Sequence, residues 1–169
     1  MDRRTMLAAF GAAGAGVGII ELAASRPALS QARTPRELAE QFAATLSAHD
    51  ITAFAALIAE DYVNHQVSAA APAPPAGITP KQGTVGFFAA RLKGIPDLSV
   101  SIEALVASED RCAASFVYTG THQGIYLGVP PTGKSLRFTS CDIFRVADGK
   151  LVEHWGMGDT AGQLAQLKG

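Results

Sequence analysis

The spacing of apolar residues changes along this chain, from a period of about four residues to a period of two. In the first half, Leu38, Phe42 and Leu46 share one side of a helical period, which predicts a helix over residues 36–47. The preceding Thr34-Pro35 has the residue types that begin helices. The folded part of the chain is therefore expected to start with an amphipathic helix.

Two further helices are predicted before the pattern changes. Asp50 is placed to cap a short second helix. Thr79-Pro80 begins a third helix, which turns Phe88 inward and ends at Gly94. The stretch between these two helices, residues 67–78, is rich in Pro and Ala and is predicted to be a flexible loop.

From residue 97 onward, apolar and polar residues alternate, which is typical of strands with one buried face. Four strands are predicted, over residues 98–106, 112–122, 136–146 and 151–158. A last helical turn follows Asp159. Helices followed by a meandering antiparallel sheet indicate an α+β fold, with three N-terminal helices packed on one face of the sheet.

The turns predict which side chains meet on the inner face of the sheet. Asp148-Gly149 is a strong signal for a two-residue hairpin, which puts Asp142 opposite Trp155. A similar count across the preceding loop brings Tyr118 opposite Asp142. This register assigns His154 to the outer, solvent face. The inner face is predicted to hold Phe116, Tyr118, His122, Phe138, Asp142, Phe144, Leu151, Glu153, Trp155 and Met157.

Asp142 is the candidate catalytic residue, because alternation assigns its carboxylate to an apolar, aromatic face. Burial makes a carboxyl group better able to exchange protons near neutral pH. His122, near the loop mouth, is the candidate second catalytic group, and a histidine that is only hydrogen-bonded at the rim would satisfy the same pattern. A buried Asp that only bonds to Tyr118 or to the Trp155 indole would satisfy the same pattern, so a purely structural role stays open.

The candidate substrate-binding residues come from three parts of the chain. Asn64 and His65 directly precede the Pro/Ala-rich loop, where a polar pair can reach into a cavity or simply cap the helix. Aromatic residues of the third helix and the sheet would form the walls, although such residues are more often plain core. The full set is Asn64, His65, Phe88, Tyr118, Phe138 and Trp155.

Residues 128–135, GVPPTGKS, have the spacing of a phosphate-binding loop. Such a loop needs backbone N–H groups that point at phosphates, and a helix directly after it. Pro130 and Pro131 have no N–H to donate, and the alternating residues after Ser135 predict a strand. The stretch is therefore interpreted as a loop between two strands, and no nucleotide is expected to bind there.

The N-terminus predicts export. Arg3-Arg4 precede an uncharged run rich in Ala and Gly, which resembles a bacterial twin-arginine signal. Small residues up to Ala32 suit a signal peptidase, so residues 1–32 are interpreted as the signal and 33–169 as the mature domain, periplasmic or secreted. An amphipathic or disordered N-terminal tail is the alternative.

Charge and cysteine content narrow the range of partners. A net charge of −1 gives no electrostatic footprint for nucleic acid or an anionic membrane. Cys112 and Cys141 lie far apart in the predicted strands, so free thiols are expected. With two cysteines, four histidines and no CxxC or HExxH spacing, the sequence does not predict a metal site.

The outer face of the predicted sheet carries apolar residues among its charges. Val117, Thr119, Ile143 and Val152 fall on this face. The pattern favours pairing with a second copy, so a homodimer is expected.

Several of these stretches together resemble the SnoaL-like polyketide cyclases and ester cyclases, over residues 36–167. They are Asp61-Tyr-Val-Asn-His65, Gly120-Thr-His-Gln-Gly124, Gly128-Val-Pro-Pro-Thr-Gly-Lys134, Asp142-Ile-Phe-Arg145 and Asp148-Gly-Lys-Leu-Val-Glu-His-Trp155. The resemblance implies the nuclear transport factor 2-like fold, in which a curved sheet wraps around helices to form a conical pocket. It also accounts for GVPPTGKS as a loop of that family.

For activity, the resemblance implies a cofactor-free intramolecular aldol ring closure on a polyketide ester, a small apolar or aromatic molecule with carbonyl groups. An Asp would remove the proton next to a carbonyl with a His assisting, and these roles carry over to Asp142 and His122. Export is a departure, because polyketides are normally cyclised in the cytoplasm. Two alternatives remain open: an exported domain that binds a small molecule without catalysis, and an isomerase or hydrolase of the same fold.

Overall fold

A computed structural model describes residues 32–66 and 73–169 of the chain. The predicted export signal, up to residue 31, and the first half of the Pro/Ala-rich loop lie outside the described residues. The elements in chain order are α1 (Pro35–Ser47), α2 (Ile51–Leu57), β1 (Ile58–Asn64), α3 (Pro80–Gly94), β2 (Ser99–Ala107), β3 (Arg111–Thr121), β4 (Ser135–Ala147), β5 (Lys150–Gly158) and α4 (Thr160–Lys168). None of the described helices is long and apolar enough to span a membrane.

The helices begin where their capping residues predict. Thr34 accepts a hydrogen bond from the N–H of Glu37, whose carboxylate accepts from the N–H of Thr34 in return. Thr79 and Gln82 form the same reciprocal cap at the start of α3, and Asp50 caps α2. These caps satisfy N–H groups that the first helical turn leaves without partners, so the helix starts are confirmed.

The sheet has one strand more than the sequence predicted. Its five strands lie in the order β1-β5-β4-β3-β2, and the four predicted strands pair in antiparallel fashion as expected. The additional strand, β1, pairs in parallel with β5, so the sheet is mixed. The prediction missed β1 because only Ile58 and Tyr62 are buried in it, a spacing of four that does not alternate.

The register between β4 and β5 differs from the prediction by one residue. Next to the hairpin, Ala147 pairs with Lys150 and Val146 with Leu151, as predicted. A bulge then shifts the register, and beyond it Asp142 pairs with Gly156. Side chains alternate with a period of two, so one additional residue turns the rest of the strand over.

The bulge reverses four predicted orientations. His154, predicted to face solvent, is buried, and its strand partner is the buried Phe144. Trp155 pairs with the exposed Ile143 instead, and Glu153 pairs with Arg145. Met157 is 78% exposed. The predicted inward orientation of Glu153, Trp155 and Met157 was therefore wrong.

Between β3 and β4 the predicted register was wrong by an even number of residues. Tyr118 lies opposite Phe138, and Asp142 lies opposite Ala114. An even shift keeps every side chain on its face, so Tyr118 and Asp142 share the inner face as predicted.

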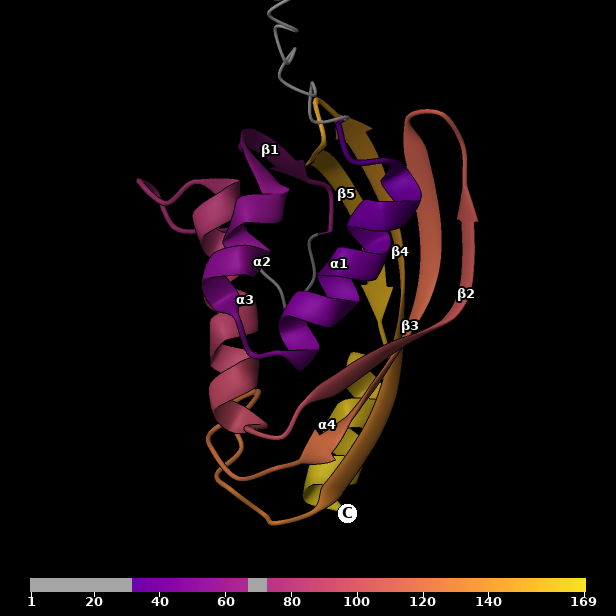
Figure 1. Ribbon diagram of the computed structural model, residues 1–169. Helices are drawn as coiled ribbons and strands as arrows, with labels where there is room; N and C mark the ends of the chain where they lie inside the picture. The colour runs from indigo at the N-terminus through magenta and orange to yellow at the C-terminus, as the bar shows by residue number, and fades with distance from the viewer. Residues whose placement is uncertain (1–31, 67–72) are drawn as a thin grey trace, which may run out of the picture. The chain divides into compact units, whose positions relative to one another are not determined.

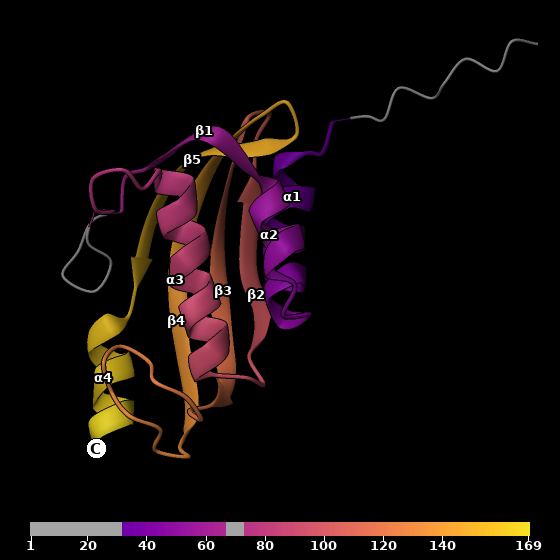
Figure 2. The ribbon, with the colours of Figure 1, turned by 90° about the vertical axis from the view of Figure 1, so that its left-hand side faces the viewer.

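The helices α1, α2 and α3 lie together on one face of the sheet, as Figures 1 and 2 show. Phe42 of α1 is the centre of their contact with the strands, with its ring 5.0–5.4 Å from four other phenylalanine rings, those of Phe54, Phe88, Phe116 and Phe144. The helix α4 contacts β4. The helices and the sheet thus enclose an apolar core and position the cavity described below.

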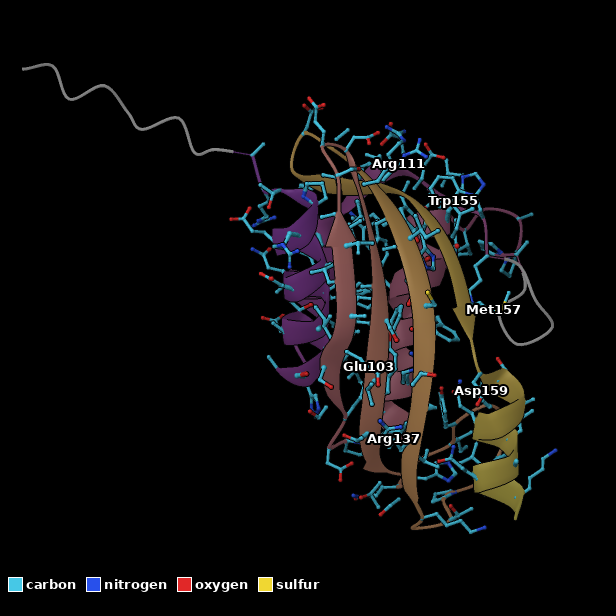
Figure 3. The ribbon with its side chains drawn as sticks, turned by 90° about the vertical axis from the view of Figure 1, so that its right-hand side faces the viewer. Glu103, Arg111, Arg137, Trp155, Met157 and Asp159 are labelled. Atoms are coloured by element: carbon cyan, nitrogen blue, oxygen red, sulfur yellow. The ribbon has the colours of Figure 1, made fainter. Side chains whose placement is uncertain are left out.

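Figure 3 shows the other face of the sheet, from which Arg111, Trp155 and Met157 project. Of the residues expected to pair with a second copy, Ile143 is exposed and Val117 is buried. The homodimer stays a prediction.

Candidate active site

A cavity of about 120 Å3 lies between α3 and the strands β3, β4 and β5. This is close to the roughly 150 Å3 of an engineered cavity that holds one benzene molecule. Its walls include Asn64, Phe87, Phe88, Arg91, Tyr118, Tyr126, Ser140, Asp142, His154 and Gln163. The cavity therefore combines aromatic rings with a small set of polar groups that converge on it.

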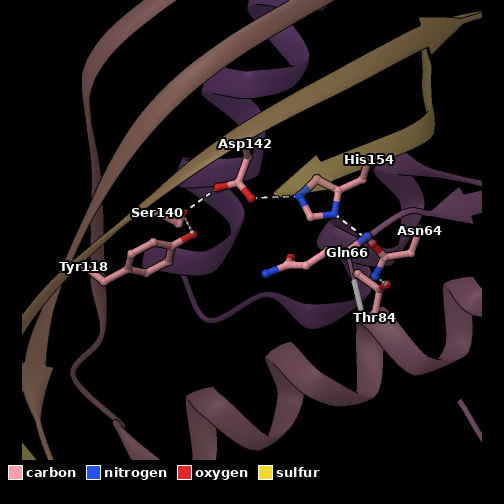
Figure 4. A network of polar contacts seen from close by, with 7 residues as sticks. All are labelled: Asn64, Gln66, Thr84, Tyr118, Ser140, Asp142 and His154. Carbon is pink, nitrogen blue, oxygen red and sulfur yellow. Dashed lines mark hydrogen bonds and ion pairs between the residues drawn. The ribbon is translucent and has the colours of Figure 1, made fainter. Parts of the chain in front are cut away.

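Asp142 is the acidic residue in the wall of this cavity. It is 5% exposed, and its Oδ1 lies 2.7 Å from Nε2 of His154. The hydroxyl of Ser140 donates to the other carboxylate oxygen over 2.5 Å. Figure 4 shows Asp142 between these two partners, with Asn64 on the far side of the imidazole ring.

The contacts of Asn64 determine which nitrogen of His154 carries a hydrogen. Asn64 Oδ1 accepts the backbone N–H of Gln66 at 3.0 Å, which identifies it as the amide oxygen. The same oxygen lies 3.1 Å from Nδ1 of His154, so Nδ1 must be the donor. One proton shared between Nε2 and Asp142 then satisfies both atoms, and the pair is neutral overall wherever that proton lies.

Gly156 leaves the space in which this pair forms. It lies opposite Asp142 in the neighbouring strand. A Cβ atom added at Gly156 would overlap both the Asp142 carboxylate and the His154 imidazole. The close contact between Asp142 and His154 therefore depends on a residue without a side chain at this position.

Tyr118 lies next to the pair. Its hydroxyl is 3.4 Å from Ser140 Oγ. Burial raises the pKa of Tyr118 well above its ordinary value, and the nearby Arg91 guanidinium opposes this only in part. The phenol therefore keeps its hydrogen at all physiological pH values and is available as a donor.

A family model covers most of the chain. The family model described as SnoaL-like polyketide cyclase matches residues 36–167. The chain belongs to the SnoaL-like polyketide cyclase family. The range is the one over which the sequence motifs resembled that family, so the resemblance is confirmed.

Solved structures of several Streptomyces proteins are similar to this SnoaL-like domain. IdmH from Streptomyces antibioticus, assigned as a polyketide cyclase, is 32% identical over 79% of this chain and 97% of its own, with a TM-score of 0.67. AclR from Streptomyces galilaeus, assigned as a hydroxylase, is 28% identical over 79% and 80%, with a TM-score of 0.66. TsrD from Streptomyces laurentii is 25% identical over 79% and 93%, with a TM-score of 0.67. No curated protein matches the chain significantly.

Three of the predicted site residues meet Asp142 in the cavity of this SnoaL-like protein. Asn64, Phe88 and Tyr118 all line it. Phe138 does not line it, but its ring stacks on that of Tyr118 with 5.0 Å between centroids. Phe138 thus packs against Tyr118 and restricts the orientation of its ring.

His122 lies apart from Asp142. It is fully buried, and its Nδ1 accepts hydrogen bonds from the hydroxyl and the backbone N–H of Thr132, at 2.9 and 3.2 Å. These bonds connect the end of β3 to the loop before β4. His122 is not part of the cavity wall, and the histidine beside Asp142 is His154.

His65 and Trp155 form a separate pair outside the cavity wall. Their rings stack with 4.4 Å between centroids, and His65 bonds to Glu153 at 2.8 Å. Hydrogen bonds from His65 and Arg145 lower the pKa of Glu153. Neither ring contributes to the cavity.

Sequence reasoning missed Arg91 and the two residues that accompany it in the cavity wall, Tyr126 and Gln163. The available signal was helical spacing, because Arg91 follows Phe87 and Phe88 by four and three residues and so shares their face. A charged residue near the end of a helix is normally expected to face solvent, so the spacing alone did not identify Arg91 as a cavity residue.

Proposed function

We propose that this protein abstracts a proton from the carbon next to a carbonyl group, without a cofactor, and so promotes an aldol-type ring closure. The carboxylate of Asp142 is the base, and His154 takes the assisting role that the sequence suggested for His122. The observation that supports this most is the buried Asp142 carboxylate in a cavity wall, 2.7 Å from an imidazole nitrogen.

The step needs only groups of this chain and the substrate. Asp142 takes the proton, and the electron pair of the C–H bond passes into an enolate. The enolate carbon attacks a second carbonyl of the same molecule, forming a C–C bond and an alkoxide. The alkoxide then takes the proton back from Asp142, which restores the carboxylate.

The surroundings of Asp142 support this chemistry in two ways. The Asp142 carboxylate is 5% exposed, so few water molecules solvate it. A poorly solvated carboxylate accepts a proton from the substrate more readily than a hydrated one does. When Asp142 takes that proton, the His154 imidazolium and the Tyr118 hydroxyl remain as a positive charge and a donor for the enolate. Both groups line the same cavity.

The substrate class follows from the family and the cavity. We propose a small apolar or aromatic molecule with carbonyl groups, of the kind that SnoaL-like polyketide cyclases cyclise. A cavity of about 120 Å3 is large enough for the reacting part of a substrate if that part is no larger than one ring.

The test is deuterium uptake from heavy water by phenylacetone, an enolisable ketone with one ring, followed by NMR. The protein should exchange the CH2 protons faster than buffer does, and Asp142→Asn should lower this rate by about 100-fold or more. Asp61→Asn, the same change at an exposed residue of β1, is the matched control and should keep the rate.

Two outcomes would contradict the proposal. A folded Asp142→Asn variant with unchanged exchange would remove Asp142 from the mechanism. A wild-type protein that binds phenylacetone without exchanging its protons would favour the binding-only alternative.

A further inference from the structure

Arg91 is a buried cation in the wall of the cavity. It lies in the last turn of α3 and is 7% exposed. Within the ranges that the structure describes, 32–66 and 73–169, no carboxylate forms an ion pair with its guanidinium. Arg is almost never fully buried unless it is paired, so this residue calls for a physical account.

Aromatic rings and one hydroxyl hold the guanidinium in place. Its central carbon lies 4.7–5.9 Å from the ring centroids of Phe87, Phe88, Tyr118, Tyr126 and Phe138. Ring faces attract a cation but offer no strong hydrogen-bond acceptor. The packing therefore orients the charge and leaves most of its N–H donors available.

One donor of Arg91 is already used. Nε donates to the Tyr126 hydroxyl at 3.1 Å, and that hydroxyl donates onward to Gln163 Oε1 at 2.5 Å. Among the described residues, nothing accepts a hydrogen bond from the two terminal Nη groups. These groups have the planar fork that matches a carboxylate in a bidentate pair.

The acid in the same cavity does not serve as the counter-ion. Both oxygens of Asp142 have other partners, His154 and Ser140. Because the Asp142–His154 pair shares one proton, it is neutral overall, and the cavity keeps the positive charge of Arg91. A ligand with one negative charge would complement this cavity, and a neutral ligand would leave the buried cation unpaired.

We propose that Arg91 receives the carboxylate of an aromatic acid, so that the ligand is a free acid rather than the ester that the family resemblance implies. The inference rests on the proposed function in one respect, that the cavity is where the small molecule binds. It does not depend on catalysis by Asp142. The ring of Tyr118 lies 4.9 Å from the guanidinium carbon of Arg91, and its hydroxyl lies 3.4 Å from Ser140 Oγ. The acid end of the ligand would therefore lie near the ring of Tyr118, and the reacting end near its hydroxyl.

The test compares two probes that differ only in charge, hydrocinnamate and hydrocinnamamide, by calorimetric or NMR titration at neutral pH. The wild-type protein should bind the acid at least about tenfold more tightly than the amide. The preference should persist at high salt, because a buried pair is screened much less than a surface pair.

Two variants assign the preference to Arg91. Arg91→Met removes the charge while filling similar space, and should bring the affinity ratio of acid to amide close to one. Gln163→Glu keeps Arg91 and adds a carboxylate one hydroxyl away from it, and should also reduce the ratio; this second variant decides the matter if Arg91→Met does not fold. Asp61→Asn, at the exposed position of β1 used as the control above, should leave the ratio unchanged.

Equal affinity of the two probes for the wild-type protein would overturn the proposal, and so would binding of neither at millimolar concentration. A preference that survives both Arg91→Met and Gln163→Glu would also overturn it. An acid preference in a wild-type protein that exchanges no protons would support this proposal and contradict the proposed function, so the two proposals can fail separately.

Discussion

Gly156 is the residue whose replacement probes the Asp142–His154 pair without removing either partner. Gly156→Ala adds a methyl group where both side chains meet. We expect this variant to separate them, to lower proton exchange at least about tenfold, and to cost about 1–3 kcal/mol of stability through overpacking. Deuterium uptake by phenylacetone measures the first effect, and thermal unfolding measures the second.

The same strand offers a control. A methyl group at Gly158 would meet only the Gln163 side chain at 3.9 Å, an ordinary contact. Gly158→Ala should therefore exchange at close to the wild-type rate. If Gly156→Ala also kept that rate while remaining folded, the close contact of Asp142 with His154 would not matter for the reaction.

At the scale of elements, local signals predicted most of the fold. The helix starts at Thr34, Asp50 and Thr79 were predictable because a cap acts on the next three residues. The inner position of Asp142 was predictable because alternation survives a register error of even size. These features depend on a few neighbouring residues and so can be read from them.

The orientation of β5 could not be predicted in this way. The hairpin at Asp148-Gly149 sets the register correctly for two pairs, and the bulge between the Val146–Leu151 and Arg145–Glu153 pairs then turns the strand over. The residue types of this strand do not show which of its side chains face inward, since His154, Trp155 and Glu153 are each found on buried and on exposed faces of sheets. The phase is decided by contacts from distant segments, such as that between His154 and Asn64 of β1.

Arg91 was missed for a related reason. A charged residue on a helix is normally solvated, and the sequence alone does not say that Tyr126 and Gln163 enclose it. Tyr126 lies in the loop after β3 and Gln163 in α4, far from α3 in the chain. Only the tertiary arrangement brings these three residues together.

At the scale of the whole molecule, the family and the predicted export signal point in different directions. The chain matches a family described as polyketide cyclases, for which the sequence resemblance implies work in the cytoplasm, whereas Arg3-Arg4 and the apolar run after them are typical of exported proteins. We propose that this protein works outside the cytoplasm on a small acid available there.

Export has a direct test. Replacing Arg3 and Arg4 by lysine keeps the positive charge and removes the twin-arginine pair. In a bacterial host, the wild-type chain should reach the periplasm with Arg33 as its first residue, and the Arg3→Lys, Arg4→Lys chain should stay uncleaved in the cytoplasm. Fractionation and N-terminal sequencing measure both, and an unchanged mature N-terminus in the double variant would contradict the twin-arginine interpretation.

The bulge in β5 places His154, rather than His122, beside the Asp142 carboxylate, and we expect proton exchange to depend on this pair. The most direct measurement is deuterium uptake by phenylacetone in His154→Gln and His122→Gln, compared with the wild-type protein at equal folded concentration. We expect His154→Gln to lose at least about tenfold in rate. His122→Gln, whose native side chain bonds to Thr132 rather than to Asp142, should exchange at nearly the wild-type rate. A folded His154→Gln protein at full rate, with the loss in His122→Gln instead, would contradict this expectation.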